Sequence, residues 1–287
     1  AERRSDFNAV CAGFALPHPE GLKIYDTKIA NGQRPIAVRW YLPTDSDSKL
    51  LDTTPIVVYF HGGGFVLGGL ESHDSIVADL AHSTGLTVMA VDYALAPEHR
   101  FPAACKDALK SVKSCLSKSA FQQIILAGDS AGAWLAAYVA QHLSQQKRQQ
   151  LLGQLLVYPL LGGDVTKGSY VMHKDAPLLT TQDIIWFYQQ FFGPETTTWP
   201  KGPLIETAFG ELPPTVIFAA EYDPLHDDGL AYARAITSAG GKAVCRSEKG
   251  LVHGYLRGRH TVKRIKESFT QMIAALQHLA NQSWPYS

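Results

Sequence analysis

Short apolar runs alternate with segments of helical period along this chain, and that alternation limits the folds open to it. The runs are rich in β-branched residues and end at Gly, Pro or Asp, as strands do. Strands that alternate with helices are typical of a largely parallel sheet with crossover helices. The eight expected strands are residues 22–29, 35–41, 56–60, 87–92, 123–127, 154–157, 215–220 and 243–248. We therefore predict an α/β protein.

The strand patterns also indicate how the sheet is covered. The first two runs alternate polar and apolar residues, which favours an antiparallel edge, whereas the middle runs are almost entirely apolar, as in strands covered by helices on both faces. The last helix has one apolar stripe, made of Val262, Ile265, Phe269, Met272, Leu276 and Leu279. The expected sheet is mostly parallel, mixed at one edge and flanked by helices.

A chain of 287 residues fits one α/β domain with insertions. We expect a core formed by residues 21–160 and 206–287, and cap elements formed by residues 1–20 and 161–205. The second cap element carries a helix with seven aromatic or apolar residues, Ile184, Ile185, Trp186, Phe187, Tyr188, Phe191 and Phe192. A helix that is apolar on nearly every face must be covered on several sides, which suits a lid; packing on the core or on a second subunit is the alternative.

Composition excludes several classes of partner. The 26 basic residues balance the 26 acidic ones, so the chain lacks the positive charge that nucleic-acid binding needs. No apolar run approaches the roughly 20 residues that span a bilayer. The four cysteines lack CxxC spacing and are expected to be free thiols, which favours a cytoplasmic location. Because the chain begins at Ala1 and not at Met, secretion stays open.

The segment Gly128-Asp129-Ser130-Ala131-Gly132 has the pattern G-x-S-x-G between a predicted strand and a predicted helix. In that context the pattern is typical of a nucleophile elbow. The turn around Ser130 would be so sharp that only glycine fits two positions before and two positions after it. The start of the next helix would direct free N–H groups at the same point, which favours an oxyanion there.

The segment His61-Gly62-Gly63-Gly64-Phe65 follows the third predicted strand. Consecutive glycines leave backbone N–H groups accessible, so we expect Gly63 and Gly64, together with Ala131, to form an oxyanion hole. A flexible hairpin and a nucleotide-binding loop are alternatives. However, the glycines here do not fit the dinucleotide-binding pattern G-x-G-x-x-G, and the chain has no G-x-x-x-x-G-K-[ST] phosphate loop. His61 is expected to hold the loop by a hydrogen bond.

A serine nucleophile needs a histidine base and a carboxylate that orients it, in the chain order Ser, acid, His. Asp223 directly follows the seventh predicted strand, and His253 follows the eighth. Asp227 and Asp228 are weaker candidates for the acid, because they fall in the expected first turn of the next helix. The other histidines do not pair with Cys or Glu at ligand spacing, so no metal is predicted.

These motifs resemble the hormone-sensitive-lipase-like (bacterial type IV) carboxylesterases of the α/β-hydrolase fold. The resemblance covers residues 56–255 and rests on HGGGF, on Val91-Asp92-Tyr93 with the following Ala94-Leu95-Ala96-Pro97-Glu98, on GDSAG, on Asp223-Pro224-Leu225 and on His253-Gly254. It implies a Ser130, His253 and Asp223 triad, an oxyanion hole at Gly63, Gly64 and Ala131, a small helical cap, no cofactor, and small esters of short to medium acyl chains as substrates.

The family usually has Gly-Asn after GDSAG, where this chain has Ala133-Trp134, and His-Gly-Phe where this chain has His-Gly-Tyr. The side chains suggested for substrate binding are Phe65, Trp134, Trp186 and Tyr255. Deacetylase, lipase or amidase chemistry on the same triad stays open, as does a hydrolase fold that binds a small molecule without turnover. An exposed eighth strand would allow a homodimer.

Overall fold

The computed structural model describes residues 2–32, 34–44, 55–117, 123–195, 202–206 and 208–286. Within this part of the chain eight strands form one sheet in the order β1-β2-β4-β3-β5-β6-β7-β8. Their bounds are β1 Leu22–Ile29, β2 Ile36–Pro43, β3 Ile56–Phe60, β4 Val88–Asp92, β5 Ile124–Asp129, β6 Leu151–Val157, β7 Thr215–Tyr222 and β8 Ala243–Val252. The predicted α/β-hydrolase sheet is confirmed, although β6 begins earlier and β8 ends later than expected.

The directions of the strands agree with the polar and apolar patterns of their sequences. The first two strands pair antiparallel and β2 is antiparallel to β4, while the strands from β4 through β8 all pair in parallel. Every residue of β3 and β5 is buried, because helices cover both faces there. The last strand pairs with β7 alone and ends the sheet, so the homodimer suggested through this strand stays a prediction.

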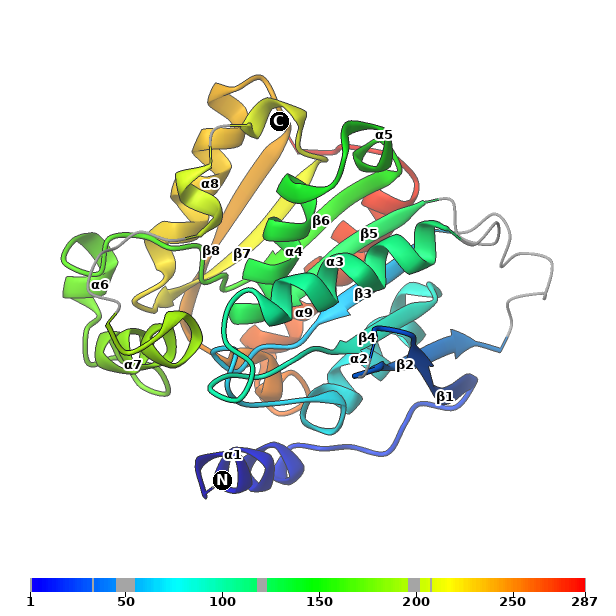
Figure 1. Cartoon of the computed structure of the whole chain (residues 1–287), viewed down its shortest axis with the longest axis horizontal. Coiled ribbons are helices and arrows are strands. Elements are labelled where there is room, and N and C mark those ends of the chain that lie inside the picture. The colour runs from blue at the N-terminus through cyan, green and yellow to red at the C-terminus, as the bar shows by residue number, and fades with distance from the viewer. Residues whose placement is uncertain are drawn as a thin grey trace.

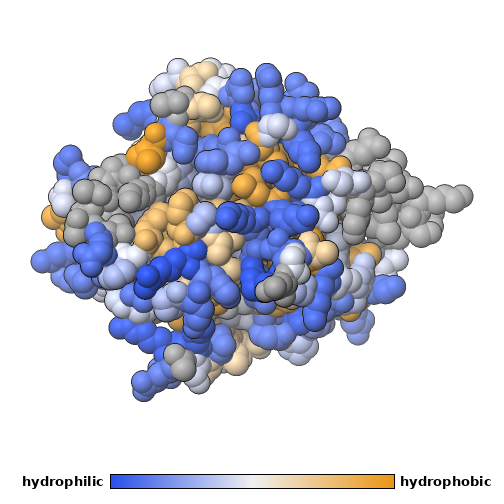
Figure 2. Space-filling model, viewed as in Figure 1, coloured by the Kyte–Doolittle hydropathy of each residue, from blue (hydrophilic) through white to orange (hydrophobic). Residues whose placement is uncertain are grey.

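The helices follow the strands in the alternating order expected from the sequence. They are α1 Glu2–Gly13, α2 Leu70–Thr84, α3 Ala103–Leu116, α4 Ala131–His142, α5 Gln145–Arg148, α6 Gly168–Met172, α7 Thr181–Phe192, α8 His226–Ser238 and α9 Lys263–Ala280, with short 3₁₀ helices at Pro203–Ile205, Phe209–Glu211 and Tyr255–Gly258. Among the described residues no helix is both long enough and apolar enough to cross a membrane. The face in Figure 2 is mostly hydrophilic, with separate apolar patches.

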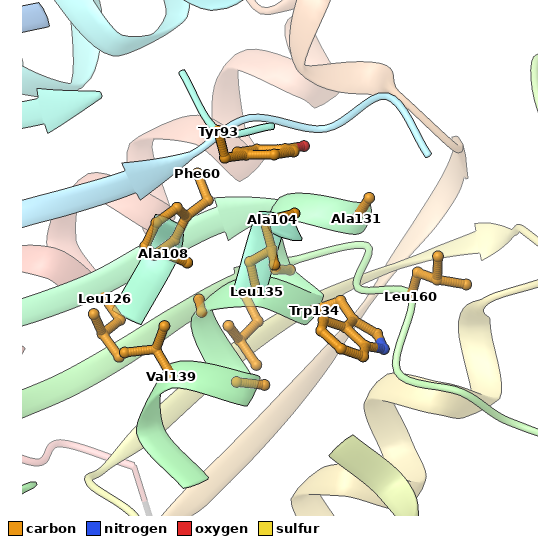
Figure 3. Close-up of a cluster of buried hydrophobic side chains, with 14 of the residues drawn as sticks. Phe60, Tyr93, Ala104, Ala108, Leu126, Ala131, Trp134, Leu135, Val139 and Leu160 are labelled. Carbon is orange, nitrogen blue, oxygen red and sulfur yellow. The ribbon is translucent and has the colours of Figure 1, made fainter. Parts of the chain in front are cut away.

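Two hydrophobic cores lie on opposite faces of the sheet. Helices α3, α4 and α8 contribute to one core, and α2 and α9 contribute to the other (Figure 1). Figure 3 shows part of the first core, where Leu135 and Val139 of α4 lie near Phe60 of β3 and Leu126 of β5, while Trp134 lies farther along toward Leu160. Burying both faces of the central strands fixes their position, and with it the position of the loops at their carboxyl ends.

The backbone at the start of α4 lies very close to the end of β3. A Cβ atom at Gly132 would overlap the carbonyl oxygen of Phe60 at the end of β3, and a Cβ at Gly128 would overlap the backbone of Gly132. Only glycine therefore fits at these two positions, because a Cβ atom at either one would overlap backbone atoms. This approach lets α4 start directly behind the end of β3.

The two segments expected to form a cap lie outside the sheet. Helix α1 lies at the lower edge of the view in Figure 1, and α6 and α7 lie at its left side. Arg4 attaches α1 to the core, because its side chain donates to the carbonyl oxygens of Val66 at 2.7 Å and Ala96 at 2.8 Å and pairs with Glu98. Arg3 lies over the ring of Trp186, which connects α1 to α7. The sequence did not predict that this polar segment is helical.

A buried carboxylate anchors the start of the second segment. One oxygen of Asp228 accepts hydrogen bonds from the N–H groups of Leu161, Gly162 and Gly163 at 2.7, 3.1 and 3.3 Å, and from the Tyr170 hydroxyl at 3.0 Å. Burial raises the pKa of Asp228 to about 6, although these donors oppose the shift. Asp228 thus fixes the loop that follows β6.

The close approach of Gly132 predicts that Gly132→Ala is strongly destabilising. The added methyl group would meet backbone, which cannot move aside as a flexible side chain can, so we expect a loss of about 2–3 kcal/mol of unfolding free energy. Gly13→Ala is the matched control, because a Cβ at Gly13 meets nothing within 4 Å. Urea denaturation followed by circular dichroism measures both variants. Equal stability of Gly132→Ala and wild type would contradict this account.

Asp228 predicts a pH dependence of stability. Its carboxyl has an ordinary pKa near 4 when unfolded and about 6 when folded, so the folded state binds the proton more tightly. The resulting stabilisation is complete below about pH 4 and is lost as the pH rises through about 6. Lowering the pH from about 7.5 to about 4.5 should therefore raise the unfolding free energy of wild type by about 2 kcal/mol relative to Asp228→Asn, which cannot titrate.

Denaturant titrations at the two pH values test this difference. Asp175→Asn serves as control, because Asp175 is exposed. The unfolding free energy of this variant should respond to pH as that of wild type does. A pH response shared by wild type and Asp228→Asn would show that the carboxyl does not titrate in this range.

Candidate active site

Ser130 occupies a strained turn between β5 and α4. Its backbone has φ 53° and ψ −120°, in the left-handed half of conformational space that a residue with a side chain rarely adopts. The Ser130 N–H donates to the carbonyl of Val157 at the end of β6, and α4 starts at the next residue. The buried strand and the buried helix hold the turn in this conformation.

Three side chains from separate parts of the chain meet at the carboxyl end of the sheet. The Ser130 hydroxyl lies 2.9 Å from Nε2 of His253, and Nδ1 of His253 lies 2.7 Å from Oδ2 of Asp223. Asp223 is fully buried, and its other oxygen accepts the N–H of Leu225 at 2.9 Å. A carboxylate at Nδ1 keeps a proton on that nitrogen, which leaves Nε2 free to accept one from serine.

The two weaker candidates for the acid lie elsewhere. Asp227 accepts the N–H of Ser169 at 2.8 Å, and Asp228 holds the loop after β6. Both belong to the first turn of α8, as expected, but each also fixes part of the segment between β6 and β7. Of the three aspartates, Asp223 is the one that contacts His253.

The glycine loop after β3 faces the same point. Gly63 and Gly64 adopt positive φ values of 119° and 61°, and a Cβ at Gly64 would overlap the ring of Phe187 from α7. Within the described residues the N–H groups of Gly63, Gly64 and Ala131 have no hydrogen-bond acceptor. Unpaired N–H groups beside a nucleophile are suited to stabilise a negatively charged oxygen.

His61 holds this loop, as its place in the sequence suggested. Its Nδ1 lies 2.8 Å from the carbonyl oxygen of Gly62, and its ring stacks on Tyr93 at 4.3 Å between centroids. The Tyr93 hydroxyl donates to the His61 carbonyl at 2.7 Å. Burial lowers the pKa of His61 to about 3, so the imidazole is neutral near neutral pH.

Asp129, the residue before Ser130, connects the turn to the glycine loop, a role that was not predicted from the sequence. Its Oδ1 accepts the Tyr59 hydroxyl at 2.7 Å and the N–H of Gly62 at 2.9 Å, and its Oδ2 lies 3.4 Å from Nε2 of His73 and from the Tyr158 hydroxyl. Burial alone would raise the pKa of Asp129, but these neighbours hold it below its ordinary value. The one available signal was an acidic residue at the end of an apolar strand.

Tyr158 was also not predicted from the sequence, and it packs beside His253. Its ring lies 4.7 Å from that of His253, and the residue has a positive φ of 34°. A bulky residue in this conformation is strained, and such residues gather at functional sites. Nothing in the sequence after the sixth strand signals this contact, because it depends on how β6 and the loop after β8 lie in space.

The serine opens into a cavity of about 570 Å³. Ser130, His253, Gly63 and Gly64 line its base. Its apolar walls come mainly from α1, from the segment between β6 and β7, and from the chain after β8, and include Phe7, Val10, Phe14, Leu178, Leu179, Ile184, Phe187, Tyr255, Val262 and Ile265. Most small-molecule sites are cavities of this size with mainly apolar walls.

Of the four side chains suggested for substrate binding, Tyr255 lines this cavity. Phe65 and Trp134 are buried behind it, where both rings pack on Phe191, and Trp186 lies under Arg3. Figure 3 shows the Trp134 side chain inside the core. These three residues are not among those that line the cavity in the described part of the chain. No group of three or more His, Cys, Asp or Glu that could hold a metal is found there either.

Comparison with known proteins agrees with this geometry. The chain is 34% identical over 268 residues to an esterase, LipI, of Mycobacterium tuberculosis, covering 91% of this chain and 83% of that protein. It is 33% identical to an ethyl acetate hydrolase of Pseudomonas putida, covering 84% of this chain and 78% of the relative.

Solved esterase structures are similar to this fold over almost the whole chain. The hyperthermophilic esterase of the archaeon Pyrobaculum calidifontis superimposes with a TM-score of 0.86 at 31% identity, covering 97% of this chain and 91% of that chain. A thermostable carboxylesterase cloned from a metagenomic library gives a TM-score of 0.88 at 30% identity and covers 97% of each chain. The alpha/beta hydrolase fold family model matches residues 57–257. The chain therefore belongs to the alpha/beta hydrolase fold family, in its hormone-sensitive-lipase-like branch, as its motifs predicted.

Proposed function

We propose that this protein is a serine carboxylesterase that hydrolyses small esters of short to medium acyl chain through an acyl-enzyme intermediate. The observation that carries the proposal is the hydrogen-bonded row from Ser130 Oγ through His253 to Asp223, beside three unpaired N–H groups. The names of the relatives, which include esterases and an ethyl acetate hydrolase, support the same reaction class.

Acylation begins when Ser130 Oγ attacks the ester carbonyl carbon and its proton passes to His253 Nε2. The carbonyl oxygen becomes an oxyanion, which the N–H groups of Gly63, Gly64 and Ala131 stabilise. Asp223 stabilises the imidazolium that forms. When the tetrahedral intermediate collapses, the bond to the alcohol oxygen breaks, His253 returns its proton to that oxygen, and the acyl group stays on Ser130.

Deacylation repeats these steps with water. His253 accepts a proton from the attacking water, the same N–H groups hold the second oxyanion, and the Ser130 oxygen leaves with the proton from His253. The carboxylic acid is released and the free enzyme is restored. The residues of the chain account for every proton in this cycle.

The cavity supports small esters as substrates. A volume of about 570 Å³ holds a short or medium acyl chain together with a small alcohol. The amino-terminal segment with α1 and the segment between β6 and β7 supply apolar side chains to its walls, including Phe7, Phe14 and Phe187. We propose that these two segments act as the cap of the site.

Ser130→Ala should abolish ester hydrolysis and leave the fold unchanged. The substitution removes only the side-chain hydroxyl and leaves the surrounding turn in place. Thermal unfolding should therefore be close to that of wild type. Release of nitrophenol from nitrophenyl acetate, together with circular dichroism, measures both properties. Undiminished turnover by pure Ser130→Ala protein would exclude Ser130 as the nucleophile.

The choice of acid is tested by two matched substitutions. Asp223→Asn should lower kcat/KM by about 10⁴-fold, because an amide no longer holds His253 in the required tautomer. Asp227→Asn changes a carboxylate that contacts Ser169 and not His253, so it should retain most activity. If Asp227→Asn lost activity and Asp223→Asn did not, the acid would have to be reassigned.

A further inference from the structure

One charged side chain in the cavity is not used by the reaction described above. Arg257 lies four residues after His253, in the 3₁₀ helix that follows β8, and it lines the same cavity as Ser130. Among the cavity-lining residues in the described part of the chain it is the one lysine or arginine. Its side chain is partly buried between α1 and α2.

The guanidinium group is only partly satisfied by the protein. Nη1 of Arg257 donates to the carbonyl oxygen of Ser72 at 2.9 Å, and the group lies 5.2 Å from the ring centroid of Phe7. No carboxylate of the described residues forms an ion pair with it, and Nε and Nη2 have no hydrogen-bond acceptor there. Arginine offers five N–H donors in a planar fork, so several donors remain for a ligand.

The acidic residue of the same cavity does not occupy these donors. Asp129 receives its hydrogen bonds from Tyr59, Gly62, His73 and Tyr158, which come from β3, the glycine loop, α2 and the end of β6. The charge of Arg257 acts on Asp129 only through space. A partly dehydrated cation without a bound anion is unfavourable in a mainly apolar cavity, and an anionic ligand would remove that cost.

We propose that Arg257 determines substrate specificity by binding a carboxylate carried by the ester, on its acyl or its alcohol part. The proposal rests on the proposed esterase function and names the substrate class of the same site. A planar guanidinium binds a carboxylate through two parallel N–H···O bonds, and a single positive charge matches a single negative one. Arg257 takes no part in bond breaking, since it would position the substrate while Ser130 and His253 react.

Matched pairs of esters test this proposal. Monoethyl glutarate carries a carboxylate on its acyl part, and ethyl isoheptanoate carries an isopropyl group in its place. For the alcohol part, γ-acetoxybutyrate and isohexyl acetate form the corresponding pair. The measurement is kcat/KM for each ester at about pH 8, where the carboxylate is ionised, by titration of the acid released.

Arg257→Gln should lower kcat/KM about 10- to 100-fold for the charged member of at least one pair and leave its neutral partner within about threefold. Arg257→Lys keeps the charge without the planar fork and should lie in between. Arg234→Gln is the matched control, because Arg234 is an exposed residue of α8 outside the cavity, and it should change neither member. Added salt should weaken the preference for the charged ester in wild type.

Two results would overturn the proposal. In the first, the ratio of charged to neutral ester is the same in wild type and Arg257→Gln for both pairs. In the second, Arg257→Gln lowers both members equally, which is what loss of the contact with Phe7 alone would do. The neutral esters test the proposed function separately, since failure of wild type to hydrolyse any of them would contradict the esterase assignment itself.

Discussion

The close contact between the start of α4 and the end of β3 fixes the geometry of the site. Gly132 lies against the carbonyl of Phe60, and this allows α4 to begin one residue after Ser130. The strained backbone of Ser130 persists because the strand before it and most of the helix after it are buried. Since the glycine loop continues directly from Phe60, the same contact brings the nucleophile and the loop N–H groups together.

A buried hydrogen-bond network around Asp129 connects the parts of this site. Tyr59, Gly62, His73 and Tyr158 reach Asp129 from four different elements, so the carboxylate pairs with groups that would otherwise have no partner in the core. A network of this kind resists independent movement of its members. N–H groups that are held in place before the reaction need no rearrangement when charge develops on the substrate.

The sequence was sufficient to predict the sheet and the meeting of Ser130, His253 and Asp223 at its carboxyl end. Short apolar runs such as 56–60 and 123–127, bounded by turn residues, favour covered strands, and Gly128, Ser130 and Gly132 between a predicted strand and a predicted helix favour a sharp turn. Asp223 could be preferred over Asp227 and Asp228 because it directly follows the end of β7, whereas the other two lie in the first turn of α8. Such features depend on local pattern and on strand order alone.

The remaining features depend on distances between elements that no local pattern contains. Trp134 was suggested as a substrate contact, but its side chain points into the core, since the direction of a helical side chain depends on where the helix lies. Helix α1 was missed because its sequence is polar, with Cys11 as its one buried residue. Its position is determined by Arg4 and Arg3, whose partners lie in distant parts of the chain.

Helix α1 forms part of one wall of the cavity and is attached to the core by side-chain contacts. This helix and the residue after it supply Phe7, Val10 and Phe14 to the cavity, and a mostly exposed segment, residues 15–20, joins them to β1. These wall residues lie within the first 14 residues of the chain, far in sequence from Ser130, Asp223 and His253. One wall of the cavity and the cluster of Ser130, His253 and Asp223 are therefore carried by separate stretches of polypeptide, so the sequence of that wall can change while the three residues are retained.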